Sequence, residues 1–150
     1  LPVTEDAWWG VAYSPKLRRF VAVSTGFNFV TSTDGTSWQQ VDPRWSGVNV
    51  RSWSKVAWIP AREVFVATSD SGRAASSSDG LNWSLLPPLP TAHGPNELVW
   101  SPELELLVGC GESSFVVSHL RIPYDEATQF LVPDVPPPER NLKSYIRALP

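Results

Sequence analysis

The sequence predicts an all-β fold made of propeller-type blades, each a four-stranded antiparallel sheet. The first observation is a unit of 45 residues that is written twice. Thirteen of the 36 residues from Trp8 to Pro43 recur between Trp53 and Pro88 in one unbroken register. The second is that apolar residues in each copy alternate or run for a few positions between turn signals, as strands require. Successive units of about 40 to 45 residues with four strands each are typical of propeller blades.

The first copy should form four strands joined by short turns, because each apolar run is bounded by proline, glycine or aspartate. The second copy repeats this plan from Trp53 to Leu86. The expected strands of the first copy are Trp8–Ser14, Arg19–Ser24, Phe27–Ser32 and Ser37–Val41.

A third, imperfect copy begins at Leu98, with its spacing shortened to 42 and then 41 residues. Its strands should include Leu106–Gly109 and Phe115–Ser118, and His119 follows where the Asp-Gly pair is expected. The three repeats are placed at about 8–48, 53–91 and 96–122, within residues 1–122. Residues 123–150 are rich in proline and are expected to form an extended arm, with room for a short helix at 139–147.

Three blades are fewer than the roughly four to eight that close a propeller, so the exposed sheet edges need partners. Three solutions are open. The chain is a piece of a longer propeller, or two chains associate to give six blades, or its arms add strands to the sheet of another protein. The chain begins at Leu1 and contains no methionine, as expected of a trimmed or partial product.

A motif of the form Ser-x-Asp-Gly-x-x-Trp occurs at the same place in the first two copies. Glycine accepts a positive φ in a tight hairpin, and the aspartate can accept hydrogen bonds from backbone N–H groups of its own turn. The tryptophan then lies back over the turn and buries a large apolar area. The motif residues are Ser32, Asp34, Gly35 and Trp38 in the first copy and Ser77, Asp79, Gly80 and Trp83 in the second.

This motif resembles the Asp-box or BNR-type repeat of β-propellers, in the compact form found in phage and bacterial proteins. The resemblance spans about residues 8 to 120, and the aspartate and glycine are adjacent here, whereas the usual box separates them by one residue. It implies the fold and not an activity, since the box is structural in that family and lies away from any active site.

A sialidase-like glycosidase would require three converging arginines, a Tyr-Glu pair and a separate acid. Tyr13 occupies the position of Trp58 and Trp100 in the other copies, so we expect a core aromatic there rather than a nucleophile. We expect no enzyme activity, no catalytic residues and no cofactor. The arginines Arg18, Arg19, Arg62 and Arg73 are interpreted as solvated edge charges.

Metal and thiol chemistry are not indicated either. His93 and His119 are 26 residues apart and have no ligand partners at metal-binding spacing. The single cysteine, Cys110, aligns with Val23 and Thr68 of the earlier copies and is expected to be a small buried residue.

Six of the eight tryptophans recur at equivalent positions and are therefore expected in the core. Trp9 and Trp45 fall outside the repeat, which makes them the candidates for stacking on a sugar ring. A glycan-binding module would use them with Arg44, Asn49 and Arg51.

The net charge of −3 gives no reason to expect nucleic acid as a partner, and no apolar run is long enough to cross a membrane. We therefore interpret the chain as a non-enzymatic structural or interaction module that binds protein partners or itself, in a phage or virus particle. The alternatives are the glycan-binding module and a fragment of a sialidase-like glycoside hydrolase. The compartment is left open, with the virion and the extracellular space as the options considered.

Overall fold

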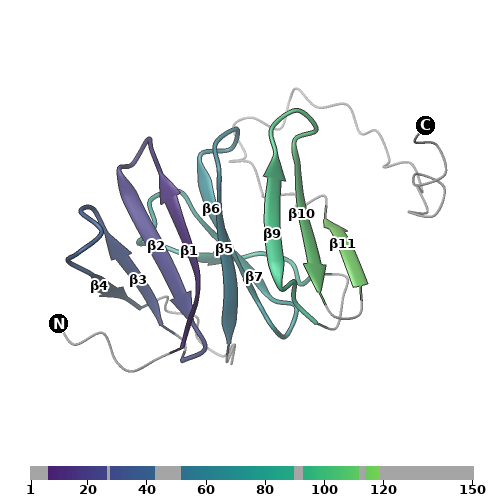
Figure 1. Cartoon of the computed structure of the whole chain (residues 1–150), viewed down its shortest axis with the longest axis horizontal. Helices are drawn as coiled ribbons and strands as arrows, with labels where there is room; N and C mark the ends of the chain where they lie inside the picture. The colour runs from purple at the N-terminus through teal and green to yellow at the C-terminus, as the bar shows by residue number, and fades with distance from the viewer. Residues whose placement is uncertain (1–6, 27, 43–51, 90–92, 112–113, 119–150) are drawn as a thin grey trace.

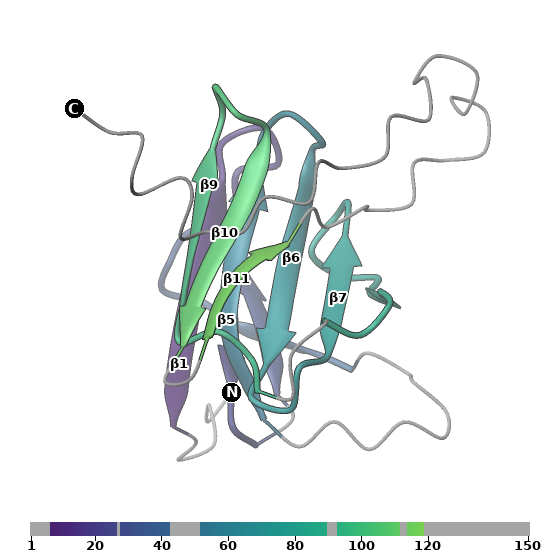
Figure 2. The same ribbon diagram turned by 90° about the vertical axis from the view of Figure 1, so that its right-hand side faces the viewer.

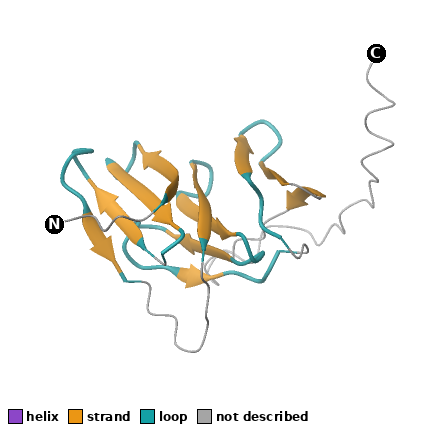
Figure 3. Cartoon of the chain, turned by 60° about the horizontal axis from the view of Figure 1, so that its bottom comes forward, coloured by secondary structure: helices purple, strands orange, loops and turns teal. Residues whose placement is uncertain are grey.

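The structure is a computed structural model of the 150-residue chain and describes residues 7–26, 28–42, 52–89, 93–111 and 114–118. These residues form eleven strands and no helix, as Figure 3 shows, which confirms the all-β prediction. No helix in this part of the chain is long and apolar enough to cross a membrane. The predicted arm at 123–150 and the predicted helix at 139–147 lie outside the described residues.

The strands form three antiparallel sheets, and in each one the strands follow one another in chain order (Figure 1). The first sheet contains β1 (Trp8–Ser14), β2 (Arg19–Ser24), β3 (Phe29–Ser32) and β4 (Gln39–Val41). The second contains β5 (Trp53–Ile59), β6 (Val64–Ser69), β7 (Ala74–Ser77) and β8 (Ser84–Leu85). The third contains β9 (Glu97–Ser101), β10 (Leu106–Gly111) and β11 (Ser114–Ser118).

Two of the predicted strands begin later than expected. The fourth strand begins at Gln39 and not at Ser37, because the backbone N–H of Ser37 is held by the Asp34 carboxylate and belongs to the turn. The third strand begins at Phe29, and Phe27, where it was expected to begin, lies outside the described residues.

The three sheets stand in a row, with the first strand of each beside the first strand of the next. Strand β5 lies between β1 and β9, and the remaining strands of each sheet extend away from this inner row (Figures 1 and 2). Each sheet therefore has a leading face, turned toward the preceding sheet in the chain, and a trailing face, turned toward the next one.

The core between the first and second sheets joins the trailing face of one to the leading face of the other. The trailing face of the first sheet contributes Val21, Val23 and Phe29. The ring of Phe29 lies 5.1 Å from that of Trp53 and 4.6 Å from that of Trp83, measured between centroids. The leading face of the second sheet consists of Val56, Trp58, Phe65 and Trp83.

A second core of the same design lies between the second and third sheets. Ile59, Val66 and Ala74 of the second sheet pack against Leu107 of the third, and all four are buried. The leading face of the third sheet also presents Leu98 and Trp100, which are partly buried against this core.

The backbone shows that the third sheet is a true copy although its sequence departs most. Arg18, Glu63 and Glu105 are the only non-glycine residues with positive φ in the described part of the chain, at 49°, 54° and 50°. Each occupies the last position of the turn between the first two strands of its sheet. The three sheets therefore share one hairpin geometry, and their residues can be compared position by position.

We predict that Gly80→Ala destabilises the chain more than Gly35→Ala, although both glycines have a positive φ, 74° and 76°. The strain of alanine at such a φ costs about 1 kcal/mol at either site. A Cβ at Gly80 would in addition lie 2.9 Å from Cδ of Arg19 and 3.0 Å from Cγ2 of Val21, across the junction between sheets. At Gly35 its nearest contact is an ordinary 3.6 Å to Phe20.

Urea unfolding of the two variants and the parent chain measures both losses. Equal losses in free energy of unfolding would contradict the packing of the Gly80 turn against the first sheet.

Candidate functional site

The Asp-Gly turn of the first sheet is closed by hydrogen bonds from its own side chains. Oδ1 of Asp34 accepts hydrogen bonds from the backbone N–H groups of Thr36, at 2.8 Å, and Ser37, at 2.7 Å. Oγ of Ser32 donates to the same carboxylate oxygen at 3.0 Å and accepts from the N–H of Gly35 at 2.9 Å. The indole N–H of Trp38 donates to the carbonyl of Gly35 at 3.2 Å, so the ring lies back over the turn.

The second sheet repeats the hydrogen bonds that the aspartate and the serine make in this turn. Oδ1 of Asp79 accepts from the N–H groups of Leu81, at 2.8 Å, and Asn82, at 2.7 Å. The hydroxyl of Ser77 donates to it at 3.0 Å and accepts from the N–H of Gly80 at 2.8 Å. The Asn82 side chain adds a hydrogen bond to the second carboxylate oxygen.

These bonds lower the pKa of both carboxyl groups. At Asp34, the backbone N–H of Ser37 and then that of Thr36 hold the pKa far below its usual value. At Asp79, partial burial acts in the opposite direction, but the hydrogen bonds from Asn82, Leu81 and Ser77 outweigh it and lower the pKa to about 2. Both aspartates therefore act as ionised acceptors of the hydrogen bonds within their own turns.

The inner strands begin at the end of the sheets opposite to these turns. Trp8 pairs with Ser24 at one end, whereas at the other end Arg19 pairs with Ser14, and Ser32, which opens the Asp-Gly turn, pairs with Phe20. The Asp-Gly turns therefore lie away from the starts of β1, β5 and β9.

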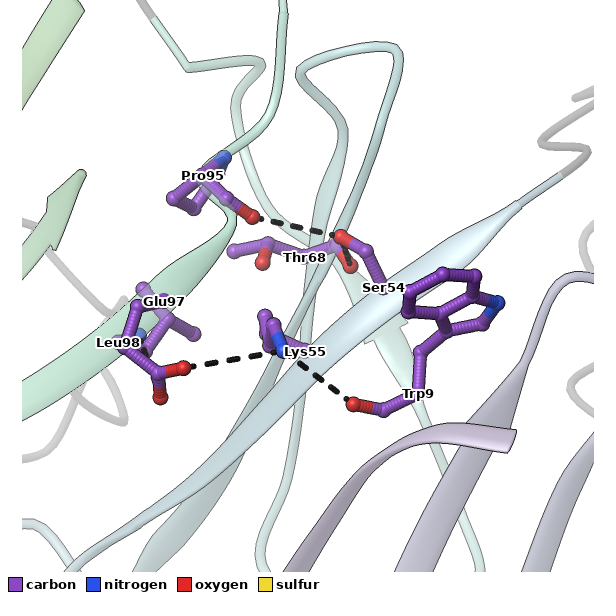
Figure 4. Close-up of polar contacts among 7 residues, drawn as sticks. All are labelled: Trp9, Ser54, Lys55, Thr68, Pro95, Glu97 and Leu98. Carbon is purple, nitrogen blue, oxygen red and sulfur yellow. Dashed lines mark hydrogen bonds and ion pairs between the residues drawn. The ribbon is translucent and has the colours of Figure 1, made fainter. Parts of the chain in front are cut away.

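Polar contacts join the three sheets where these inner strands begin, as Figure 4 shows. Nζ of Lys55 donates to the backbone carbonyl of Trp9 at 3.3 Å and lies 3.8 Å from a carboxylate oxygen of Glu97. Oγ of Ser54 donates to the carbonyl of Thr68 at 3.2 Å and lies 3.5 Å from that of Pro95. We call Trp9, Ser54, Lys55 and Glu97 the axial cluster.

The axial cluster contains positions that are structurally equivalent in the three sheets but are occupied by residues of different chemistry. Gly10, Lys55 and Glu97 pair with equivalent positions of the second strand in their three sheets. Trp9 and Ser54 are equivalent residues, because each lies at the register irregularity near the start of the first strand of its sheet. Trp9 is 56% exposed. Because the common fold does not require these residue types, the cluster is a candidate binding surface.

The leading face of the first sheet is a second candidate surface. Among the described residues no sheet lies against it. Its ring stack matches that of the second sheet: Tyr13 to Phe20 is 4.4 Å and Phe20 to Trp38 is 6.2 Å, against 4.8 Å and 6.5 Å in the copy. The residues of this face are Val11, Tyr13, Phe20 and Trp38, and their counterparts are Val56, Trp58, Phe65 and Trp83.

Exposure separates the two copies of this face. Val11 is 63% exposed, whereas its counterpart Val56 is 8% exposed. The expectation that Tyr13 is a core aromatic is wrong, because its side chain is 42% exposed where no preceding sheet covers it. Ala22 and Val30 are buried on the same face, so the open part runs along β1.

Within the described part of the chain, no sheet lies against the trailing face of the third sheet, which is the other open end of the row. It presents Val99, which is 61% exposed, together with Val108 and Cys110. The expectation that Cys110 is buried is wrong, because the thiol is exposed. Its counterparts Val23 and Thr68 are fully buried, since a following sheet covers each of them.

The residues predicted for a glycan site are only partly placed by the structure. Trp9 lies in the axial cluster and is exposed. Trp45, Arg44, Asn49 and Arg51 lie outside the described residues. Sequence reasoning missed Lys55 and Glu97, although the differences between copies at these equivalent positions could have revealed them.

Two of the arginines considered for a sialidase-like site, Arg62 and Arg73, are not brought together by the structure. Arg62 lies in the turn before β6 and Arg73 in the turn after it, at opposite ends of that strand. No group of three or more histidine, cysteine, aspartate or glutamate side chains could hold a metal ion within the described ranges.

Comparisons with known proteins support the fold. No family model matches the chain, and no curated protein matches it. Among 24 matching chains of solved structures are "YCF48 bound to D1 peptide", with a TM-score of 0.52 and 17% identity, and "Crystal structure of Nidogen/Laminin Complex", with 0.56 and 14%. Each alignment covers 73% of this chain, but only 35% and 41% of the respective matched chain.

Both structures are β-propellers, so the three sheets are blades of a propeller fold, as predicted. The chain spans well under half the length of the structures that it matches. At these identities the likeness concerns the fold alone.

We predict that stability depends on pH through the Asp-Gly turns. Because folding lowers the pKa of Asp79 to about 2, its contribution to stability is present above the ordinary value of 3.8 and is lost as the pH falls toward 2. Asp79→Asn should cost about 1 kcal/mol at neutral pH and reduce the dependence on pH below 4.

Thermal unfolding of both proteins between pH 7 and pH 2 tests this. The exposed Asp42, outside any Asp-Gly turn, supplies the control Asp42→Asn, which should behave as the parent chain does. A constant gap between the Asp79→Asn and parent midpoints at every pH would refute the assignment.

Proposed function

We propose that the chain is a non-enzymatic interaction module whose open leading face binds another protein, and that it serves as a structural component of a larger assembly such as a phage or virus particle. The observation that carries this proposal is the leading face of the first sheet. Its stacked aromatic rings are the copy of a face that the structure buries at the first junction. A surface built to be covered, and left exposed, is typical of a docking site.

The two structural neighbours support a protein partner. One was solved with a bound peptide, named D1, and the other is a complex named for nidogen and laminin. Propellers of this architecture thus hold peptide or protein partners. A non-enzymatic role also agrees with the separation of Arg62 and Arg73, since a carboxylate-binding arginine cluster must converge on one point.

A second candidate function is glycan binding at the axial cluster. Trp9 offers an exposed indole beside Ser54 and Lys55, and stacking of a sugar ring on an indole with polar neighbours is a common recognition mode. The sequence adds Trp45 as a second candidate, outside the described residues.

Glycan-array binding before and after the combined change Trp9→Ala and Trp45→Ala tests this placement. The double variant should lose about tenfold or more in affinity, since two lost stacking contacts of about 1 kcal/mol each exceed the roughly 1.4 kcal/mol of a tenfold change. Leu81→Ala, at an exposed apolar residue in an Asp-Gly turn, is the control. Binding that survives in the double variant would reject the site.

For the main proposal, the test is Val11→Lys. The parent chain should bind a hydrophobic dye at this face or associate in solution, and the lysine should abolish either behaviour because burying an unpaired charge costs several kcal/mol. Leu81→Lys, also exposed but located in the Asp-Gly turn of the second sheet rather than on the leading face of the first, should leave the behaviour unchanged. The readouts are dye fluorescence and sedimentation velocity over a range of concentrations.

A cooperative monomer that neither binds dye nor associates at any concentration would refute the proposed docking face. So would an equal effect of the two lysine substitutions.

A further inference from the structure

Both junctions in the structure join a trailing face to a leading face. The two open faces are one of each kind, so together they match the two sides of such a junction. At each junction the second strand of the preceding sheet contributes small residues and the leading face contributes larger ones, while Phe29 and Ile59 add large residues elsewhere on the trailing faces. At the first, Val21 and Val23 face aromatic rings, and at the second, Val66 faces Trp100 and Leu107. The open leading face carries Tyr13, Phe20 and Trp38, and the open trailing face carries Val99, Val108 and Cys110.

Resting on the proposed function, we infer that the protein docked on the leading face is a second copy of this chain, joined head to tail. The trailing face of the third sheet in one copy covers the leading face of the first sheet in the other. This makes a further junction of the kind that the chain already contains twice.

Charge supports the same pairing. At the first junction, Lys16 in the turn of the first sheet forms an ion pair with Glu63 in the turn of the second. The position of Lys16 corresponds to Glu103 in the third sheet, and that of Glu63 corresponds to Arg18 in the first. The proposed junction therefore brings Glu103 opposite Arg18, an exposed pair of opposite charges in reversed order.

The same charges argue against pairing of two like faces. A leading face set against a second leading face would bring the aromatic stacks together without small residues to receive them. It would also provide no partner for Arg18 by the geometry that Lys16 and Glu63 show. The head-to-tail arrangement satisfies both requirements at once.

Closure of the ring follows from the number of sheets. The described part of each copy has one open leading face and one open trailing face, so a head-to-tail pair contains two identical junctions and can close. Three sheets from each copy give a ring of six, which lies in the range of about four to eight blades that propellers use.

Cys110 is a built-in probe of this junction. It is exposed in the single chain, but its counterparts Val23 and Thr68 are 0% exposed at the two junctions present. Association should therefore slow the reaction of the thiol with a water-soluble disulfide reagent by about tenfold or more, in proportion to the fraction associated. Dilution should restore the reaction.

The experiment uses two matched variants, Val11→Lys on the leading face and Val99→Lys on the trailing face, with nearly equal exposure at 63% and 61%. Each variant alone damages both junctions of a closed pair and should be monomeric, with Cys110 fully reactive. Mixed in equal amounts, they retain one intact junction, between the trailing face of the first variant and the leading face of the second. The mixture should form a 1:1 complex in sedimentation velocity, and Cys110 should be protected in the Val11→Lys partner alone.

Three results would overturn the inference. If Val99→Lys associates as the parent chain does, like faces pair and the docking face stands without the head-to-tail junction. If the parent chain is monomeric with reactive Cys110 at every concentration, yet binds dye at Val11, the leading face serves another protein or a further blade. If the two variants fail to combine while the parent associates, the junction does not use these faces.

Discussion

The structure depends on one contact, in which the leading face of a sheet, with its aromatic rings, is covered by apolar residues on the trailing face of the sheet before it. No single sheet can bury Phe65 or Trp83 by itself, because a four-stranded meander has two faces and one layer. Phe29 and Val21 of the first sheet complete the core that these rings need. Stability therefore belongs to the junctions, and a row of sheets always leaves one leading face and one trailing face uncovered.

The Asp-Gly turns work in the opposite way, because their bonds are local. Every hydrogen bond to the carboxylate of Asp34 or Asp79 comes from a residue within three positions in the chain. Such a turn can form before the sheets meet, and it sets the register of the outer strands. Gly80 belongs both to a local turn and to a junction between sheets, since its turn also packs against Arg19 and Val21 of the neighbouring sheet. Local turn chemistry thus positions the surfaces that the junctions then join.

This division explains what the sequence could predict. The bounds of β1 and β2 coincide with the predicted strands, because alternation and turn residues are local signals. The burial of Tyr13 and Cys110 was predicted wrongly for one reason: burial at a repeated position depends on whether a neighbouring sheet exists, and position in the repeat carries no such information. Lys55 and Glu97 escaped notice because a search for recurring residues discards the positions that differ between copies.

The positions that differ between copies also make contacts between the sheets. At the inner row the backbone of β1 approaches β5 so closely that a Cβ on Gly10 would lie 3.0 Å from the backbone of Lys55 and Val56. The equivalent positions of the second and third sheets carry charged side chains, and Nζ of Lys55 lies 3.8 Å from Glu97 while it donates to the carbonyl of Trp9 in the first sheet. One lysine thereby links all three sheets at the end opposite to the Asp-Gly turns. The small residue in one copy and the charge in the next are complementary, so divergence between repeats here holds the blades together as well as shaping the surface beside Trp9.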